Sequence, residues 1–300
     1  MTPVRHLLDV DDLSAHELAG VLDLAERTEF PAVLASQGAG LLFEKPSART
    51  RNSMEVAVVQ LGGHPVSMRG EEVGIGTRET IEDLTRTLAC YHRVIGARVF
   101  DHTTVERMAA ASSVPVVNLL SDQAHPLQIL ADLLTMRQRF KNLAGLTVAW
   151  VGDGNNVCNS LMIGAALARM HVRVATPPGF EPSSLAVEKA RDAGGRILLT
   201  NDPAEATGVA DAVCTDVWAS MGQEGEAASR RDAFDGYTVT EELMDKANPG
   251  AIFLHCLPAH RGEEVTAEVI DGANSLVWQQ AANRLHAARG VLLWLLGVHP

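Results

Sequence analysis

The chain has 300 residues, a mass of 32.1 kDa and a formal net charge of −12, and 46% of its residues are hydrophobic. This length predicts one or two domains that fold without disulfides or structural metal, and the acidic balance with only 4% aromatic residues argues against nucleic acid or anionic lipid as a partner. The sequence has neither a signal core nor an apolar run of membrane-spanning length, so we expect an intracellular, cytoplasmic protein with no membrane partner.

Helical and strand patterns alternate along the first half of the chain. The predicted elements are a helix over 11–28, a strand over 40–45, a helix over 53–63, a strand over 65–68, a helix over 80–92, a strand over 94–100, a helix over 105–113, a strand over 115–120 and a helix over 126–140. The polar segment that follows ends in Gly145 and predicts a joint between two lobes.

The second half repeats the alternation. It predicts strands over 146–152, 171–176, 196–200, 211–217 and 251–258, a helix over 157–170, and an amphipathic helix over 282–297. Strands that alternate with helices predict an α/β fold with two doubly wound parallel-sheet lobes. In such sheets, ligands bind beyond the carboxyl ends of the strands.

The cysteines and histidines form no recognisable metal or disulfide pattern. The four cysteines are dispersed, at Cys90, Cys158, Cys214 and Cys256. No CxxC pair and no HExxH motif occurs, so we predict no metal site and no disulfide framework.

The segment FEKPSARTR, residues 43–51, has the pattern of an anion site. Pro46 and Ser47 end a strand and begin a helix, whose first N–H groups would point outward with about half a positive charge. Ser47 and Thr50 add hydroxyl donors, and Arg49 adds a forked cation suited to phosphate oxygens. Taken alone, the same residues are also typical of a serine-capped helix with solvated arginines.

The segment WVGDGNNVCNS, residues 150–160, follows a strand and opens a helix, as a dinucleotide-binding turn does. Val157 stands where the third glycine of GxGxxG is required, and the next strand ends without an acidic residue. The pattern therefore argues against an NAD(P)-dependent dehydrogenase. Asn155 and Asn156 are also typical of tight turns.

Four stretches together resemble the aspartate/ornithine carbamoyltransferase family. PSARTR (46–51) resembles its SxRTR phosphate signature, while HPLQILAD (125–132), DVWASMGQE (216–224) and HCLPAHRGEEV (255–265) resemble the ornithine branch. The matches run in order over nearly the whole chain. The resemblance implies transfer of a carbamoyl group from carbamoyl phosphate to the side-chain amine of L-ornithine, giving L-citrulline and phosphate, with no cofactor and no metal.

The resemblance also implies how the chain is organised. Residues 1–138 would bind carbamoyl phosphate, and the C-terminal helix, 285–300, would return to this first lobe. Residues 139–284 would bind ornithine, and helices would join the two lobes. The family further implies a homotrimer with active sites at subunit boundaries.

The family's donor-binding positions are carried over residue by residue. They fall on Ser47, Ala48, Arg49, Thr50, Arg98, His125, Gln128, Cys256, Leu257 and Arg284. Arg98, His125 and Cys256 would be catalytic, and hydrogen bonds to the carbonyl oxygen of the carbamoyl group would contribute about 3–4 kcal/mol each as negative charge builds there. Without the resemblance, Arg98 is also typical of a surface salt bridge and His125 of a turn before a proline.

The resemblance places the acceptor on a second set of residues, namely Asn156, Asp216, Ser220 and Met221. The Asp216 carboxylate would face the α-ammonium group of ornithine. The side-chain amine must lose a proton before it attacks, which costs about 4–5 kcal/mol at pH 7. Cys256 would lie beside that amine, although it is equally typical of a small buried side chain, and the sequence assigns no general base.

Three residues depart from the family pattern. Ala48 stands where ornithine enzymes usually have threonine, Gly74 where some members carry a glutamine that reaches a neighbouring subunit's phosphate, and Ala282 where a glutamate is common. A related transferase for putrescine, lysine or a modified ornithine, or a silent binding homologue, therefore stays an alternative. Aspartate is disfavoured as the acceptor, because the second lobe lacks an additional cationic set for two carboxylates.

Overall fold

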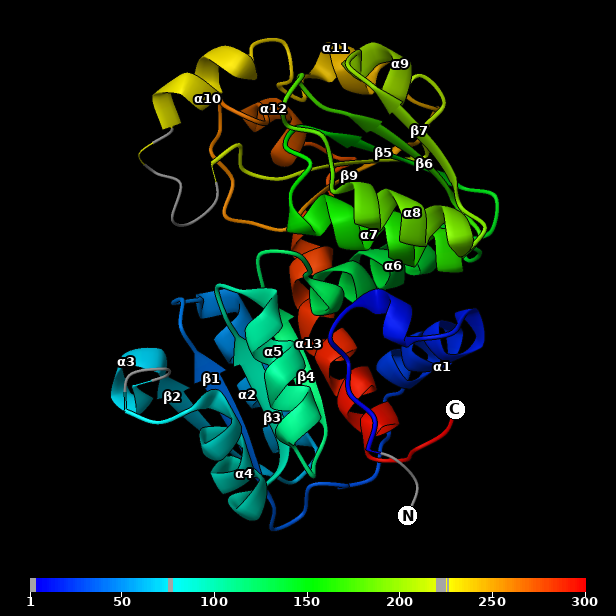
Figure 1. The fold of residues 1–300 in the computed structure, drawn as a ribbon. Coiled ribbons are helices and arrows are strands. Elements are labelled where there is room, and N and C mark those ends of the chain that lie inside the picture. The colour runs from blue at the N-terminus through cyan, green and yellow to red at the C-terminus, as the bar shows by residue number, and fades with distance from the viewer. Residues whose placement is uncertain (1–3, 75–77, 220–224, 226) are drawn as a thin grey trace. The chain divides into compact units, whose positions relative to one another are not determined.

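The computed structural model describes residues 4–74, 78–219, 225 and 227–300 (Figure 1). The chain divides into two compact units. Unit 1 comprises Met1–Ala131 and Asn283–Pro300, and unit 2 comprises Asp132–Ala282. The two boundaries fall within helices α6 (Pro126–Phe140) and α13 (Val277–Leu295), so helices join the lobes as predicted.

Unit 1 is built on a four-stranded sheet in the order β2-β1-β3-β4, with all neighbours parallel. Its strands are β1 (Gly38–Phe43), β2 (His64–Arg69), β3 (His92–Arg98) and β4 (Val116–Leu120). Its helices are the short 3-10 helix η1 (Val10–Asp12), then α1 (Ala15–Glu26), α2 (Ala48–Gln60), α3 (Gly70–Val73), α4 (Ile81–Tyr91) and α5 (His102–Ala111).

A buried apolar cluster holds α4 and α5 against this sheet. Leu84 and Leu88 of α4 and Met108 of α5 belong to the same cluster as Ile95 and Ala97 of β3. Burying one such large apolar side chain contributes about 1.5–3 kcal/mol. The apolar residues whose spacing predicts these helices are therefore the residues that pack against the sheet.

The C-terminal part of α13 packs against α1 of the same unit. Arg289 is 5% exposed, and its Nη2 donates hydrogen bonds to the carbonyl oxygens of Ala25 and Arg27, which end α1, at 3.0 and 2.9 Å. At Gly290, a β-carbon would come within 2.7 Å of the carbonyl oxygen of Val21, so only glycine permits this approach. The predicted return of the C-terminal helix to the first lobe is confirmed.

Unit 2 contains a five-stranded parallel sheet in the order β7-β6-β5-β8-β9. Its strands are β5 (Thr147–Val151), β6 (His171–Ala175), β7 (Arg196–Thr200), β8 (Ala212–Thr215) and β9 (Ile252–His255). Besides parts of α6 and α13, its helices are α7 (Asn156–Leu167), α8 (Ser184–Asp192), α9 (Pro203–Thr207), α10 (Ala227–Ala233), α11 (Glu241–Met244) and α12 (Ala267–Ile270).

Both sheets reverse their strand order beside one central strand. In unit 1 the chain runs from β1 to β2 on one side and continues with β3 on the other side of β1. In unit 2, β6 and β7 lie on one side of β5, and β8 and β9 on the other. Parallel α/β sheets bind ligands beyond the strand ends at such a reversal. Functional side chains are therefore expected after β1 and β3, and after β5 and β8.

Two helices begin earlier than their apolar spacing indicates. The helix predicted over 53–63 begins at Ala48, directly after Ser47, and the helix predicted over 282–297 begins at Val277. Most residues of the two extra turns are polar or exposed, and Trp278 is 63% exposed. A turn that buries little apolar surface leaves no hydrophobic period to detect. Within the described residues, no helix is both long and apolar enough to cross a membrane.

Candidate active site

The loop after β1 brings the N-terminus of α2 to the edge where β3 ends. The strand register pairs Phe43, the last residue of β1, with Arg98, the last residue of β3. Ser47 caps α2, because its hydroxyl oxygen accepts a hydrogen bond from the backbone N–H of Thr50 at 3.2 Å. The other N–H groups of the first turn have no partner within the helix, so this end favours an anion.

Two arginines share the hydroxyl group of Thr50. Arg98 Nη1 and Arg284 Nη2 donate to Thr50 Oγ1 at 3.3 and 3.2 Å, and Arg284 Nη1 donates to Gln128 Oε1. A threonine oxygen has two lone pairs and one proton to donate. Both lone pairs are used here, and the proton has no acceptor among the described residues. The hydroxyl proton of Thr50 is therefore available to a bound oxygen.

His125 completes this group, which we call the anion site: Thr50, Arg98, His125, Gln128 and Arg284. His125 follows β4 and is 4% exposed. Burial is the main cause of a His125 pKa that lies well below its ordinary value of 6.5. The positive charges of Arg284, Arg98 and Arg49 lower that pKa further. His125 is thus a neutral ring in a cationic surrounding, and it can donate a hydrogen bond from one nitrogen.

The low pKa of His125 predicts a loss of stability in mild acid. Above pH 6.5 the ring is neutral in both the folded and the unfolded state, so it causes no penalty. Below pH 6.5 the His125 ring binds a proton in the unfolded state but stays neutral in the folded state. The free energy of unfolding should therefore fall by about 1.4 kcal/mol per pH unit from this residue. Urea unfolding of the wild type and of His125→Gln between pH 7.5 and 5.5 measures the difference in slope; equal slopes would contradict the assignment.

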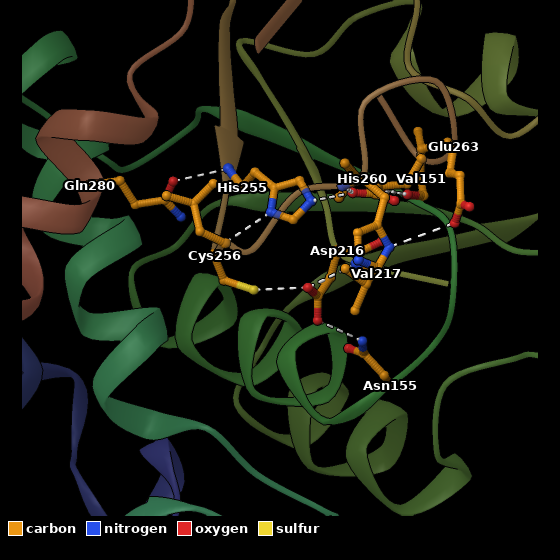
Figure 2. A network of polar contacts seen from close by, with 12 residues as sticks. Val151, Asn155, Asp216, Val217, His255, Cys256, His260, Glu263 and Gln280 are labelled. Carbon is orange, nitrogen blue, oxygen red and sulfur yellow. Dashed lines mark hydrogen bonds and ion pairs between the residues drawn. The ribbon is translucent and has the colours of Figure 1, made fainter. Parts of the chain in front are cut away.

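In unit 2, Asp216 lies at the centre of a second polar cluster (Figure 2). It directly follows β8, and its Oδ1 accepts hydrogen bonds from Cys256 Sγ at 2.9 Å and from the N–H of Val217 at 2.8 Å. Its Oδ2 accepts from Asn155 Nδ2 at 2.9 Å. Asn155 also caps α7, because its Oδ1 accepts from the N–H of Val157 at 2.9 Å. We call Asn155, Asp216 and Cys256 the Asp216 cluster.

The turn that carries Cys256 is held by a buried imidazole (Figure 2). His255 Nδ1 accepts a hydrogen bond from the N–H of Leu257 at 2.9 Å, so Nε2 carries the proton and donates to Glu264 Oε1 at 3.0 Å. Gln280 Oε1 accepts from the N–H of His255 at 2.9 Å. Leu257 has a φ of 60°, a conformation that costs a non-glycine residue about 1–2 kcal/mol. These bonds help to hold the turn, and with it the thiol of Cys256.

Three donor atoms, from Asp216, His255 and Cys256, lie within 4.8 Å of one another, which is a spacing that a metal ion could use. Both ring nitrogens of His255 are already engaged, by Leu257 and by Glu264. The thiol of Cys256 donates to Asp216. The arrangement is a hydrogen-bond network, and we assign no metal to it.

The packing around the turn after β5 leaves no space for a dinucleotide. The N–H of Gly154 donates to the carbonyl oxygen of Phe180 at 2.9 Å. A β-carbon on Gly154 would lie 2.3 Å from the backbone nitrogen of Pro182. The segment after β6 thus occupies the space where a pyrophosphate would approach the glycines of a dinucleotide-binding turn. This packing agrees with the absence of the third glycine.

Comparison with known proteins gives two family matches that together cover most of the chain. Residues 5–138 match the family profile "Aspartate/ornithine carbamoyltransferase, carbamoyl-P binding domain", and residues 144–295 match "Aspartate/ornithine carbamoyltransferase, Asp/Orn binding domain". The chain belongs to the aspartate/ornithine carbamoyltransferase family. The resemblance inferred from the four motifs is confirmed.

Three similar proteins carry the name ornithine carbamoyltransferase. The ornithine carbamoyltransferase of Thermus thermophilus is 51% identical over 300 residues, which cover 99% of this chain and 98% of the relative. That of Carboxydothermus hydrogenoformans is 49% identical, with 98% of each chain covered. The solved structure of ornithine carbamoyltransferase from Pyrococcus furiosus has a TM-score of 0.94 at 44% identity, covering 98% of this chain and 97% of that one.

Within this family fold, the structure brings together most of the residues singled out in the sequence. The anion site joins four of them through hydrogen bonds, and His125 through its electrostatic contacts. Asp216 and Cys256 are in direct contact, while Asn156 is the first residue of α7, beside the cap. Ser220 and Met221 lie outside the described residues.

Sequence reasoning missed Asn155 of the Asp216 cluster, and Glu264 and Gln280, which contact His255. The sequence indicates a turn at Asn155, yet the same side chain both caps α7 and contacts Asp216. Its position at a strand end, before a helix, is the local signal that could have found it. Glu264 and Gln280 have no such signal, because each acts through a partner distant in the sequence or in an irregular turn.

Proposed function

We propose that this protein transfers the carbamoyl group of carbamoyl phosphate to the side-chain amine of L-ornithine, giving L-citrulline and phosphate. The observation that carries the proposal is the Thr50 hydroxyl, which Arg98 and Arg284 orient so that its proton is available to an oxygen. The site is cationic and buried, as a phosphoryl or carbonyl oxygen requires. The relatives named above carry the same activity in their names.

In this proposal, residues 1–138 with 285–300 bind the donor. Ser47, Ala48, Arg49 and Thr50 would hold the phosphate at the start of α2. Within the described residues the guanidinium of Arg49 has no hydrogen-bond or ion-pair partner, so it is available to a dianion. At an effective dielectric near 20, a guanidinium in contact with one negative charge contributes about 4 kcal/mol. A local cationic site can therefore bind a dianion although the whole chain is acidic.

Chemistry at the carbamoyl carbon places negative charge on its carbonyl oxygen and then on the departing phosphate. Arg98 and a neutral His125, with Gln128 beside them, would donate hydrogen bonds to the carbamoyl group. Each good donor aimed at such an oxygen contributes about 3–4 kcal/mol to transition-state stabilisation. Arg284 would stabilise the phosphate as it leaves. Cys256 and Leu257 would lie beside the reacting carbon and amine.

Residues 139–284 would bind the acceptor through Asn156, Asp216, Ser220 and Met221. The Asp216 carboxylate is positioned by Asn155 and contacts the thiol of Cys256. A fixed carboxylate at this point favours a free α-ammonium group over a neutral amide. This favours ornithine over N-acetyl-L-ornithine, the substrate named for a structural neighbour with a TM-score of 0.88 at 28% identity.

A panel of acceptors tests the function directly. Phosphate release from carbamoyl phosphate should be fast with L-ornithine and near background with N-acetyl-L-ornithine, L-lysine, putrescine and L-aspartate. The reason is that the Asp216 carboxylate needs a cationic α-amine at a fixed distance from the attacking nitrogen. The acetylated substrate lacks that charge, lysine has a different spacing, aspartate has no side-chain amine, and putrescine lacks the α-carboxylate that the same site would bind. A higher kcat/KM for any other acceptor would replace ornithine in the proposal.

We also propose a homotrimer that works in the cytoplasm. Val56 and Val59 on α2 and Val66 on β2 are large apolar side chains that unit 1 leaves exposed, as an interface between copies would require. All four cysteines are free thiols, which suits a reducing compartment. Light scattering that gave a monomeric mass at micromolar concentration would contradict the assembly.

A further inference from the structure

A buried cation in unit 2 lies outside both clusters described above. Arg230 of α10 is 8% exposed, and its Nη1 donates to Asp153 Oδ2 at 3.0 Å and to the carbonyl oxygen of Trp218 at 2.7 Å. Its guanidinium carbon lies 5.0 Å from the ring centre of Phe180. Asp153 is also 8% exposed, so the ion pair is largely removed from water.

Two partners of Arg230, Asp153 and Trp218, belong to the segments that carry Asn155 and Asp216 of the Asp216 cluster. Asp153 lies in the turn after β5, two residues before Asn155, and Trp218 lies two residues after Asp216. These segments come from the ends of β5 and β8, where the strand order reverses. They meet at the hydrogen bond of 2.9 Å between Asn155 and Asp216. One guanidinium therefore ties together the backbones that carry both side chains.

Neighbouring contacts restrict the movement of Asp153 and Trp218, the two groups that Arg230 joins. Trp150 Nε1 donates to the carbonyl oxygen of Asp153 at 2.9 Å, which fixes the turn after β5. The Trp218 ring stacks on Phe234 with ring centres 5.4 Å apart. Phe234 directly follows α10, so the helix that carries Arg230 is anchored beside the Trp218 it binds. Removing the guanidinium would release Asp153 and Trp218 without opening the sheet itself.

A cation so deeply buried is weak support for stability, because desolvation offsets much of the attraction between the two charges. Its geometric effect is more specific. A guanidinium donates in fixed directions, so it can hold a carboxylate and a carbonyl at one separation. An apolar side chain of similar volume would fill the same space but would not fix the separation between the carboxylate and the carbonyl group.

We propose that Arg230 is a positioning residue for the amino-acid acceptor: it sets the distance between Asn155 and Asp216, and through them the affinity for the α-amino group of ornithine. The inference rests on the proposed function, in which Asp216 receives that group. Arg230 itself touches neither the acceptor nor the reacting atoms. It acts on acceptor binding and leaves the anion site of unit 1 unchanged.

The test compares Arg230→Met with Arg231→Met, its neighbour on the same helix, whose exposed side chain pairs with Glu263 at the surface. Arg230→Met should raise the KM for ornithine by about 10- to 100-fold, because weakening a hydrogen bond to a charged group has effects of that size on affinity. The kcat at saturating ornithine and the Kd for carbamoyl phosphate should stay near the wild-type values. Arg231→Met should change none of the three quantities.

Two further variants keep the proposal testable if Arg230→Met does not fold. Arg230→Lys retains the charge opposite Asp153 and should recover part of the ornithine affinity. Asp153→Asn removes that charge partner and should raise the KM for ornithine without weakening carbamoyl phosphate binding. A wild-type KM in folded Arg230→Met or Asp153→Asn, or an equal loss of both ligands, would overturn the positioning role. A wild-type protein that releases no phosphate with ornithine would instead refute the proposed function itself.

Discussion

Replacing Arg49 by alanine should weaken carbamoyl phosphate binding by about 100-fold, equivalent to about 3 kcal/mol, while the protein stays folded. Arg49 lies in the first turn of α2, and its charge acts on His125. It has no protein partner among the described residues, so its removal breaks no internal ion pair. A loss of affinity would therefore report a lost contact with the ligand.

The measurement is the Kd of carbamoyl phosphate by isothermal titration, together with the melting temperature without ligand. Arg86→Ala is the matched control, because Arg86 is an exposed arginine of the same unit that pairs with Asp83 in its own helix. The control should retain wild-type affinity. Near-normal binding by Arg49→Ala would rule out the phosphate assignment at α2.

Replacing Asp216 by asparagine should weaken ornithine binding and leave carbamoyl phosphate binding unchanged, which is the reverse of the effect expected for Arg49→Ala. The KM for ornithine should rise by about 100-fold, because a charge-assisted contact to a cationic amine is lost and the amide can no longer accept every bond that the carboxylate accepts. The Kd for carbamoyl phosphate should not change, since the anion site is built from residues of unit 1. Isosteric replacement limits the change in packing around Asn155 and Cys256.

Asp232→Asn serves as the control for this variant. Asp232 is an exposed carboxylate in α10 of the same unit, so its loss tests whether net charge alone matters. Steady-state rates over a range of ornithine concentrations and a titration with carbamoyl phosphate give the two affinities. If Asp216→Asn lost both ligands equally, separate binding units for donor and acceptor would be excluded.

Local signals in the sequence were enough to predict the strands and the longer helices, whereas shorter helices such as α8 were not predicted. The serine before α2, the arginine that ends β3 and the histidine after β4 all follow strands of one parallel sheet. Residues in those positions share an edge by topology alone. The order of the strands and the partners of each side chain were not predictable in this way. Thr50 and Arg284 are 234 positions apart, and Asn155 and Asp216 are 61 apart.

Two of the three departures from the family pattern, at Ala48 and Gly74, have a physical explanation in the structure. Ala48 is exposed at the first position of α2, where a methyl group in place of a threonine side chain changes little around the helix start. Gly74 ends α3 with a φ of 64°, and a β-carbon there would come within 2.5 Å of the Arg78 side chain, so a larger residue would have to displace it. Ala282 is exposed in α13.

Unit 1 is formed by two stretches of the chain that are separated by the whole of unit 2, and this affects the order in which its site is completed during biosynthesis. Arg284 joins Thr50 only after residues 132–282 have been translated, because the whole of unit 2 is inserted between the two parts of unit 1. On the ribosome, the N-terminal part of unit 1 would already contain Thr50 and Arg98 but not Arg284. A truncated chain that stopped within unit 2 would lack Arg284, so it could not assemble the complete anion site.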